Sequence, residues 1–474
     1  MYGNRLNEVE FSPAHHEVMA TLVSHGLGSL AWTHHGEVGA HVAQCALQVL
    51  GYGTDGGAMS AICMAYSAPG VLSLEPDIER EWKPLILSSA YDPRYLPHTS
   101  KTYALTGLIV TEKQGGSDLR RNTTTARPLG GSDREFALTG HKWYCSQLQA
   151  DSFITLARTD AGPTAFFLPR WLPDGTRNDF EVLQLKEKMG NRSNPTGEME
   201  FDGTWALRIG EEGQGIRNVM RYLRYSRLSF SIAPADLMRQ ALVNVIHFSR
   251  HRQVFGARLA DKPLMQNVLA DMALESEAAT ALVMRVARAY DDADAGDRRS
   301  DAFSRIAIPL TKYWINKRAM AYLGEAMESL GAQGYIEDSP MPRLYRELHF
   351  TCIGEGPGNL ICMDVLRAMR TDKEAYEALI DELRRSEASA DACLNETVGE
   401  LACVRLEDIS ERDARTFVET LVIALQAVLL IRHAPAYVSD AFVRSRIHPS
   451  RGFAFGTLPK GIEDQKIIDR AYPL

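Results

Sequence analysis

Four short segments near the middle of the chain determine the fold: TTTARPL (123–129), EFALTG (135–140), SFITLAR (152–158) and TAFFLP (164–169). Each is rich in threonine, aliphatic and aromatic residues. Clusters of glycine, proline, serine and aspartate separate them, which is typical of short β-strands joined by turns. Because the spacings leave no room for crossover helices, we predict a small antiparallel β domain here.

Helical patterns flank this β domain on both sides. Before it, the chain from about residue 15 to residue 96 is rich in alanine, leucine and methionine, as buried helices are. After it, apolar residues recur at intervals of three and four, as at Met238, Leu242 and Val245. Long stretches of the same kind follow at 264–290, 303–330 and 359–370. Long helices of this kind form a bundle.

We therefore predict an α+β protein that is mostly helical and has four regions. These are an N-terminal helical domain (1–106), a middle β domain (107–212), a helix-bundle domain (213–370) and an additional helical region with an irregular tail (371–474). Within the bundle, the charged segment DDADAGDRRSD (291–301) is expected to be a solvated loop between two helices.

The composition is that of a globular protein. Of 474 residues, 45% are hydrophobic and 24% are charged, which argues against long disordered segments. The net charge of -8 gives no general attraction to nucleic acid. Seven cysteines without a CxxC pair fit reduced thiols, so we expect a cytoplasmic protein. The most apolar run, 417–431, is shorter than the roughly 20 residues of a membrane span and contains Glu419, so no membrane helix is expected.

Two motifs in the β domain are suited to holding a ligand. In TEKQGGSD (111–118), two glycines let the backbone approach a ligand closely, and Thr111 and Ser117 add hydroxyl donors. The second motif, GHKWYCS (140–146), contains Trp143. The first motif is equally compatible with a turn that Asp118 stabilises, and the tryptophan is equally compatible with a core position.

Three further motifs follow along the chain. The segment KEKMGNRSNPTGEMEFDG (186–203) closes the β domain, and its lysines either contact a ligand phosphate or solvate a turn. RQVFG (252–256) supplies an arginine suited to phosphate and a phenylalanine suited to an aromatic face, although an arginine at a helix end before a glycine cap has the same pattern. Last come GAQGY (331–335) and IGEGPGN (353–359), in which Glu355 stands between two glycines. Such a carboxylate can reach into a cleft, but most glutamates in such turns are only solvated.

Taken in this order, the motifs resemble those of the acyl-CoA dehydrogenase family, and the longer forms of two of them resemble its AidB-like branch. Residues 111–118 match the family's Thr-Glu-x-x-x-Gly-Ser-Asp element, and Glu355 with Gly356 matches the element that carries its catalytic base. Some members carry the base on an earlier helix, where RYSRLSFS (224–231) offers no carboxylate. The resemblance implies a helical domain, an antiparallel β-barrel and a four-helix bundle.

The resemblance also implies the residues of the site. Glu355 is the expected base, and Ser117, Arg227 and Gly354 are expected to contact substrate. Either Cys145 or Ser146 can meet flavin N5, and Lys262 stands near the place of a glutamine that many members have. FAD is expected to be held by Val110, Thr111, Gly116, Ser117, Trp143, Ser146, Arg252, Phe255, Gly331, Gly334, Gly356 and Asn359.

The implied activity is FAD-dependent dehydrogenation of an acyl-CoA, without a metal, in a homotetramer that shares FAD sites and passes electrons to another flavoprotein. The alternatives are an AidB-like protein of the alkylation stress response that binds DNA, and a flavoprotein scaffold without turnover. DNA binding is not expected, because residues 371–474 contain 13 Lys and Arg against 18 Asp and Glu, a difference of -5. The AidB-like branch has a tryptophan before the base, so Gly354 predicts an opened pocket near the substrate's α carbon.

Overall fold

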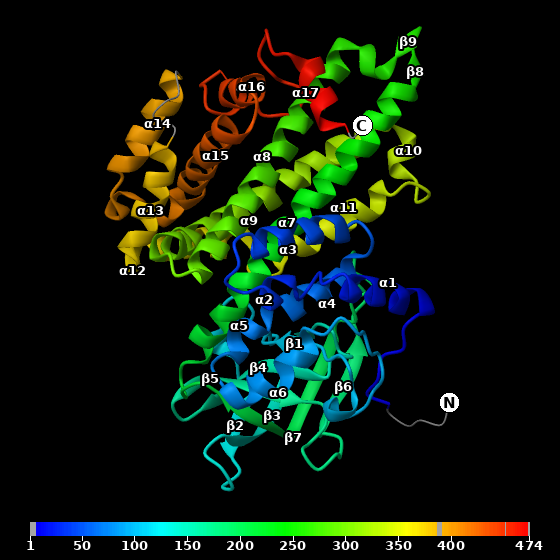
Figure 1. The fold of residues 1–474 in the computed structure, drawn as a ribbon, viewed down its shortest axis with the longest axis vertical. Helices are drawn as coiled ribbons and strands as arrows, with labels where there is room; N and C mark the ends of the chain where they lie inside the picture. Colours follow the sequence, from blue (N-terminus) through cyan, green and yellow to red (C-terminus); the bar gives the residue numbers. More distant parts are fainter. Residues whose placement is uncertain (1–5, 386–390, 451, 473–474) are drawn as a thin grey trace. The chain divides into compact units, whose positions relative to one another are not determined.

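The structure is a computed structural model that describes residues 6–385, 391–450 and 452–472. It consists of two compact units, drawn in Figure 1. The first, which we call the barrel unit, comprises Met1–His35 and Thr54–Ser226. The second, the bundle unit, comprises Gly36–Gly53 and Arg227–Leu474. A short early segment of the chain therefore belongs to the unit that the C-terminal half builds.

The barrel unit contains a seven-stranded sheet in its described part. Its strands are β1 (Thr106–Ile109), β2 (Thr125–Pro128), β3 (Glu135–Cys145), β4 (Ser152–Thr159), β5 (Gly162–Pro169), β6 (Phe180–Leu185) and β7 (Gly197–Ile209). The pairings β4–β2, β2–β3, β3–β7, β7–β5 and β5–β4 form a closed ring, while β1 and β6 add to β4 and β7. The predicted β-barrel is confirmed.

Most neighbouring strands of the barrel are antiparallel, as predicted, but two pairings are parallel. β1 runs parallel to β4, with Thr106 opposite Ser152, and β2 pairs with β4 in parallel at Thr125. These two parallel pairings were not predicted. β1 reaches β4 after the chain has passed through the antiparallel pair β2 and β3, so no crossover helix is needed.

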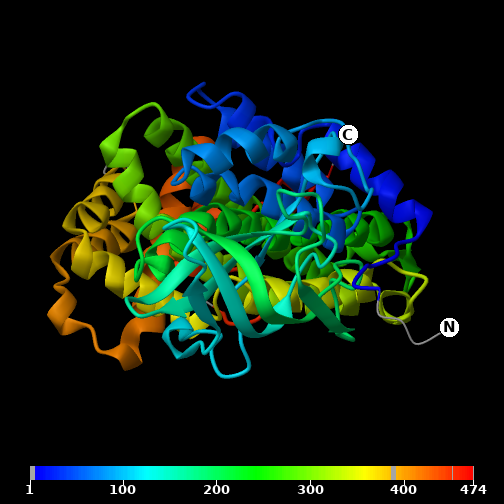
Figure 2. The same cartoon turned by 90° about the horizontal axis from the view of Figure 1, so that it is seen from below.

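Helices cover one side of the barrel. In the barrel unit these are α1 (Pro13–Ser24), α2 (Leu30–Thr33), α4 (Gly56–Ser67), α5 (Pro69–Leu72) and α6 (Pro76–Ile86). Trp82 of α6 packs into one apolar cluster with Ile154 of β4 and Phe167 of β5. Figure 2 shows these blue helices above the cyan and green strands. Because β4 and β5 face the barrel core on one side and helices on the other, both strands are buried along most of their length.

The bundle unit is built around long helices, as predicted. They are α3 (Ala40–Gly51), α7 (Gly215–His251, from Arg227 onward), α8 (Pro263–Asp294), α9 (Arg298–Ser329), α10 (Ala332–Tyr335), α11 (Met341–Ile353) and α12 (Gly358–Thr371). α9 contacts α8, α11 and α12, and its apolar residues are buried along most of its length. The unit therefore has one continuous helical core.

The predicted solvated loop at 291–301 is shorter than expected, and its exposed residues include 295–299 but not Asp291. α8 continues to Asp294 and α9 begins at Arg298. Asp291 is buried, and its carboxylate accepts a 2.6 Å hydrogen bond from the backbone N–H of His41 at the start of α3. The His41 ring contacts Asp294 at 2.9 Å. The first N–H groups of a helix lack partners within the helix, and this acidic segment supplies one to α3.

The C-terminal region is helical with an irregular end, as expected. It contains α13 (Lys373–Arg384), α14 (Ala392–Cys403), α15 (Ala414–His433), α16 (Ala436–Arg446) and α17 (Asp464–Ala471). Buried ion pairs attach it to the bundle, since Arg446 bonds Asp271 and Glu275 of α8. One described segment, Glu411–His433, is long and apolar enough to cross a membrane. It is longer than the apolar run 417–431 that was considered from the sequence. Because 67% of its most apolar window is buried inside the structure, it has the character of a core helix.

Candidate functional site

Two predicted motifs lie side by side in the barrel unit. The backbone N–H of Trp143 donates to the carbonyl of Thr111 at 2.9 Å, and Thr111 forms an antiparallel bridge with Tyr144. The TEKQGGSD loop and the end of β3 are therefore neighbours, as a shared ligand site requires. Val110 immediately precedes this contact, and its carbonyl accepts a 2.7 Å bond from the Asn122 side chain.

A buried ion pair fixes the base of this loop. The carboxylate of Glu112 lies 2.6 Å from the ammonium of Lys142, and both side chains are almost fully buried. It also accepts bonds from the Thr124 hydroxyl and the Thr123 N–H, each at 2.6 Å. Burial alone raises the pKa of Glu112, but Lys142 and these donors outweigh burial and lower it to about 2. Sequence reasoning gave these two residues no role, although both stand inside the quoted motifs.

The tip of the loop is open on one side. A Cβ at Gly115 would lie 2.2 Å from the Asn122 amide oxygen, so this position needs glycine. A Cβ at Gly116 would meet only the Thr111 methyl group at 3.7 Å, and Ser117 is exposed. Asp118 accepts bonds from the N–H and the side chain of Arg120. It therefore stabilises the turn, as the sequence also allowed. The exposed backbone at 116–118 is the part of the loop available to a ligand.

The end of β3 buries both Cys145 and Ser146. Cys145 is fully buried, its thiol donates to the Lys142 carbonyl at 3.6 Å, and burial raises its pKa to about 12. It has no open side. Ser146 is 7% exposed and lies 3.4 Å from the Thr196 hydroxyl, whereas Trp143 is 38% exposed. Trp143 therefore does not occupy a core position, and it remains a candidate ligand contact with Ser146.

The lysines of the 186–203 segment already have protein partners. Lys186 lies 4.2 Å from the centre of the Trp143 ring and pairs with Glu198 at 2.9 Å. Lys188 donates to the Asn194 carbonyl at 2.6 Å. This segment therefore supports the Trp143 face of the barrel and does not form a free cationic turn.

In the bundle unit, Glu355 lies in the short connection between α11 and α12. It is partly buried and has a φ of 58°, a left-handed conformation that costs a non-glycine residue energy. Its carbonyl accepts a 3.2 Å bond from Nε of Arg227 on α7, and the carbonyl of Gly356 accepts a 2.5 Å bond from Nζ of Lys312 on α9. Two helices of the bundle thus hold the peptide units that follow the predicted base.

Arg227 is expected from the sequence to contact substrate, but its guanidinium has protein partners. Besides the Glu355 carbonyl it bonds Asp364 of α12 at 2.7 Å, and Arg305 bonds the same carboxylate at 3.0 Å. Burial alone raises the pKa of Asp364, but the two arginines outweigh it and hold the pKa below its usual value. These contacts give Arg227 a role in supporting the Glu355 loop.

The expected opening at Gly354 is not present. A Cβ at this position would lie 2.3 Å from Cε1 of Phe230, whose ring is 7% exposed and packs on Phe350 with centres 5.2 Å apart. The space that a tryptophan before the base would need is already filled by an aromatic ring from α7. Sequence reasoning missed this because no local pattern links residues 230 and 354.

The RQVFG motif forms an exposed hairpin. β8 (Gln253–Val254) pairs with β9 (Ala257–Arg258), and Phe255 at the tip has a φ of 47° and is 98% exposed. Arg252 is exposed as well, while Lys262 donates to the Phe255 carbonyl at 3.2 Å. An aromatic ring held out on a tight turn is available to another molecule.

The remaining predicted glycines and Asn359 differ in character. A Cβ at Gly334 would lie 2.3 Å from the Met327 carbonyl, so close packing against α9 explains this glycine. Gly331 has a φ of 60° and nothing within 4 Å of a Cβ, and Gly356 has a φ of 108°. The Asn359 side chain is exposed and accepts a 2.8 Å bond from Arg415 of α15.

Comparison with known proteins identifies the family. Family models match residues 213–370 as the acyl-CoA dehydrogenase C-terminal domain, 107–204 as its middle domain and 1–93 as the N-terminal domain of the adaptive response protein AidB. AidB of Escherichia coli K12 is 41% identical over 382 residues, which cover 80% of this chain and 69% of AidB. The chain belongs to the acyl-CoA dehydrogenase family. The predicted AidB-like branch is confirmed by the same matches.

Other members of the family agree with this assignment. Acyl-CoA dehydrogenase family member 11 of Caenorhabditis elegans is 32% identical over 274 residues, 55% of this chain and 44% of that protein. The structure of C. elegans ACDH-11 in complex with C11-CoA has a TM-score of 0.83 at 23% identity and covers 99% of this chain and 85% of its own. An acyl-CoA dehydrogenase from Bacillus anthracis complexed with FAD has a TM-score of 0.70 at 18% identity, covering 90% and 79%. The last two likenesses show the fold.

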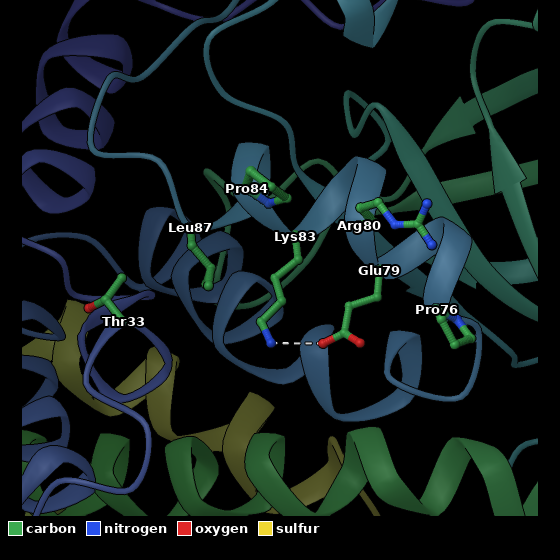
Figure 3. Close-up of a pocket in the computed structure, with 7 residues that line it drawn as sticks. All are labelled: Thr33, Pro76, Glu79, Arg80, Lys83, Pro84 and Leu87. Atoms are coloured by element: carbon green, nitrogen blue, oxygen red, sulfur yellow. Dashed lines mark hydrogen bonds and ion pairs between the residues drawn. The ribbon is translucent and has the colours of Figure 1, made fainter.

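Two other features of this acyl-CoA dehydrogenase-family chain lie apart from the predicted residues. An open hollow beside α6 is lined by residues of α2, α6 and the turn after it, with Lys83 paired to Glu79 at 2.7 Å (Figure 3). Among the described residues, Asp391, Cys393 and His448 bring three possible metal ligands within 4.8 Å of one another. Asp391 also caps α14 through the Leu394 N–H and bonds His448 at 2.9 Å, so helix capping and an ion pair account for this cluster.

Proposed function

We propose that this protein is an FAD-dependent acyl-CoA dehydrogenase in which Glu355 removes the α proton of an acyl thioester. One observation carries the proposal. Glu355 is a partly buried carboxylate in a left-handed conformation, and two buried cations hold the carbonyls of Glu355 and Gly356. A strained, over-determined glutamate is typical of a functional position and not of a solvated turn.

The residues of the barrel unit fit an FAD group. Gly116 leaves its backbone open, Ser117 offers a hydroxyl, and the half-exposed Trp143 ring offers a flat apolar face beside the Thr111 backbone. An isoalloxazine ring needs such a combination of backbone donors and aromatic surface. Support also comes from the B. anthracis relative, whose structure contains FAD.

In the proposed reaction, Glu355 takes the proton from the carbon α to the thioester carbonyl. The α C–H is a weak acid, so the site must stabilise the enolate charge as the proton leaves, and backbone N–H groups of the Glu355 loop are suited to this. Removal of water around the carboxylate raises its basicity. Bound FAD supplies the acceptor for the β hydride, and the product is the α,β-unsaturated thioester.

The wider setting is part of the proposal. ACDH-11 was solved with C11-CoA, which supports an acyl-CoA of medium length or longer as substrate. We also propose a cytoplasmic homotetramer in which Arg252 and Phe255 serve the FAD of a neighbouring subunit, and an electron-accepting flavoprotein as partner. The nearly complete exposure of Phe255 supports the contribution to a neighbour.

The test of the proposed function is Glu355→Gln. This variant should bind FAD and remain folded but reduce the flavin at least about a hundredfold more slowly with any acyl-CoA, because an amide cannot accept the proton. Anaerobic mixing followed by flavin absorbance measures the rate. Glu328→Gln, at an exposed position near the end of α9, is the matched control and should react as the parent protein does. Near-parental reduction by Glu355→Gln would contradict the assignment.

The 41% identity to AidB supports a second candidate, an AidB-like stress protein that binds DNA. This candidate requires salt-dependent retardation of duplex DNA. The C-terminal region counts against it, since Arg432 and Arg446 are used internally by Glu382 and by Asp271.

A further inference from the structure

The connection that carries Glu355 presents two consecutive carbonyl groups to the bundle. α11 ends at Ile353 and α12 begins at Gly358, so the peptides between them lack helical hydrogen bonds. The Glu355 carbonyl bonds Arg227 at 3.2 Å and the Gly356 carbonyl bonds Lys312 at 2.5 Å. The two donors come from α7 and α9, which lie far apart in sequence from this connection.

Both cations are buried in places that cost free energy. Lys312 is 1% exposed and Arg227 is 5% exposed. A carbonyl oxygen could be satisfied by a neutral donor or by water, whereas a buried charge must be compensated by its surroundings. Asp364 compensates Arg227 and Arg305, whereas the hydrogen bond of Lys312 goes to the Gly356 carbonyl. Both cations therefore bond the connection that carries Glu355.

The charges around Lys312 couple it to the proposed base. Burial lowers the pKa of Lys312 to about 7, and the nearby charges of Arg227 and Lys317 act in the same direction. The carboxylate of Glu355 and the thiol of Cys352 oppose them. The charge of Glu355 is thus one of the influences that set the pKa of Lys312.

We propose that Lys312, together with Arg227, is a positioning residue that holds the Glu355–Gly356 peptides in the strained conformation needed for proton abstraction. This inference rests on the proposed function, but the contacts themselves do not depend on it. Each cation bonds one backbone carbonyl of this connection. Together these bonds hold the backbone of Glu355 at a φ of 58°.

The first experiment measures the loop without any reaction. In Lys312→Met, amide hydrogen exchange over residues 353–358 should be at least about tenfold faster than in the parent protein, because the Gly356 carbonyl loses its donor. Lys317→Met is the matched control, since Lys317 is exposed on the same helix and near the same connection. It should leave exchange unchanged. Unchanged exchange in Lys312→Met would overturn the positioning role.

The second experiment separates positioning from simple stabilisation. Lys312→Met should slow flavin reduction by about ten- to a hundredfold with an unchanged Kd for acyl-CoA, as expected for a misplaced base. Its melting temperature should stay the same or rise, because a buried charge is removed. Lys312→Arg keeps the donor and should recover most of the rate, and Lys312→Gln serves if the methionine variant does not fold. Equal rates in all variants, or no recovery by arginine, would contradict the proposal.

The two experiments distinguish a failure of the proposed function from a failure of the positioning role. If the parent protein reduces its flavin with no acyl-CoA, the proposed function fails, while hydrogen exchange still decides whether Lys312 holds the loop. If the parent protein is active and Lys312→Met exchanges and reacts as the parent does, only the positioning role fails.

Discussion

A ring from α7 takes the space that a side chain at position 354 would need. Gly354 precedes the proposed base, and Cε1 of Phe230 would lie 2.3 Å from its Cβ. The aromatic group beside Gly354 is therefore supplied by a helix and not by the loop itself. Phe230 also contacts α9 one turn after Lys312, since its carbonyl accepts a 3.1 Å bond from the Asn316 side chain.

This packing predicts a compensating pair of substitutions. Gly354→Ala should lower the free energy of unfolding by about 1–3 kcal/mol, because the added methyl group overpacks the ring. In a Phe230→Leu background the same change should cost less, so the double variant is more stable than the sum of the single effects by about 0.5–3 kcal/mol. Denaturant unfolding measures the four proteins.

The control for this pair is Gly399→Ala. Gly399 lies within α14 with nothing within 4 Å of a Cβ, so alanine there should raise stability by up to about 1 kcal/mol. Strict additivity of Gly354→Ala and Phe230→Leu would show that the ring does not restrict position 354.

Two glutamates in glycine-rich motifs show what the sequence can and cannot reveal about residues. Motif order pointed to Glu355, whereas Glu112 was given no role although it stands inside the TEKQGGSD motif. Their surroundings come from distant parts of the chain: Lys142 makes Glu112 a structural anion, and Lys312 from α9 supports the peptide after Glu355. Local patterns locate such residues, but burial and long-range partners decide what they do.

At the scale of elements, the sequence predicted helices and strands well and misjudged their connections. The strand runs and the long apolar stretches gave β3, β4, β5, α8 and α9 nearly at their observed bounds. The whole acidic segment 291–301 was predicted to be exposed to solvent because its residues are charged. Asp291 instead bonds the start of α3, a helix some 250 residues earlier in the chain, and composition carries no trace of that contact.

The buried carboxyl group of Asp236 predicts that the stability of the protein depends on pH. Asp236 of α7 bonds Gln240 at 2.6 Å and the N–H of Gly53, and burial raises its pKa from 3.8 to about 7. Its folded pKa lies above its unfolded one. The stability it contributes is therefore fully present below about pH 4 and is lost as the pH rises through about 7.

Asp236→Asn should remove this dependence, since an amide does not titrate. The free energy of unfolding of the variant relative to the parent protein should rise between pH 4.5 and pH 8, by at most about 1.4 kcal/mol per pH unit. The difference between their melting temperatures should rise with it. Asp440→Asn, at an exposed position of α16, is the control and should show no such trend. A constant difference for Asp236→Asn across this range would show that the carboxyl is already ionised at low pH.

At the scale of the whole molecule, the two units each carry part of the proposed chemistry. The barrel unit supplies the open loop and the Trp143 face, and the bundle unit supplies Glu355 and its cations. In the C-terminal region, Arg446 bonds Asp271 and Glu275 of α8, and Arg432 bonds Glu382 of α13, so these two cations have partners inside the bundle unit. The sequence could not show this division, because the segment 36–53 joins the bundle unit only through tertiary contacts such as that of His41 with Asp291.

The exposed hairpin gives the last prediction, which concerns assembly. A phenylalanine that is 98% exposed gains nothing in an isolated chain, whereas stacking on an adenine face contributes about 1–3 kcal/mol. Phe255→Ser should therefore leave the melting of FAD-free protein unchanged but weaken FAD retention about ten- to a hundredfold, with retention falling as subunit concentration falls. Flavin absorbance after desalting at several protein concentrations measures this. Phe453→Ser, at a position 93% exposed in the same unit, is the control and should retain FAD as the parent protein does. Equal retention in both variants at every concentration would mean that Phe255 serves no neighbour's cofactor.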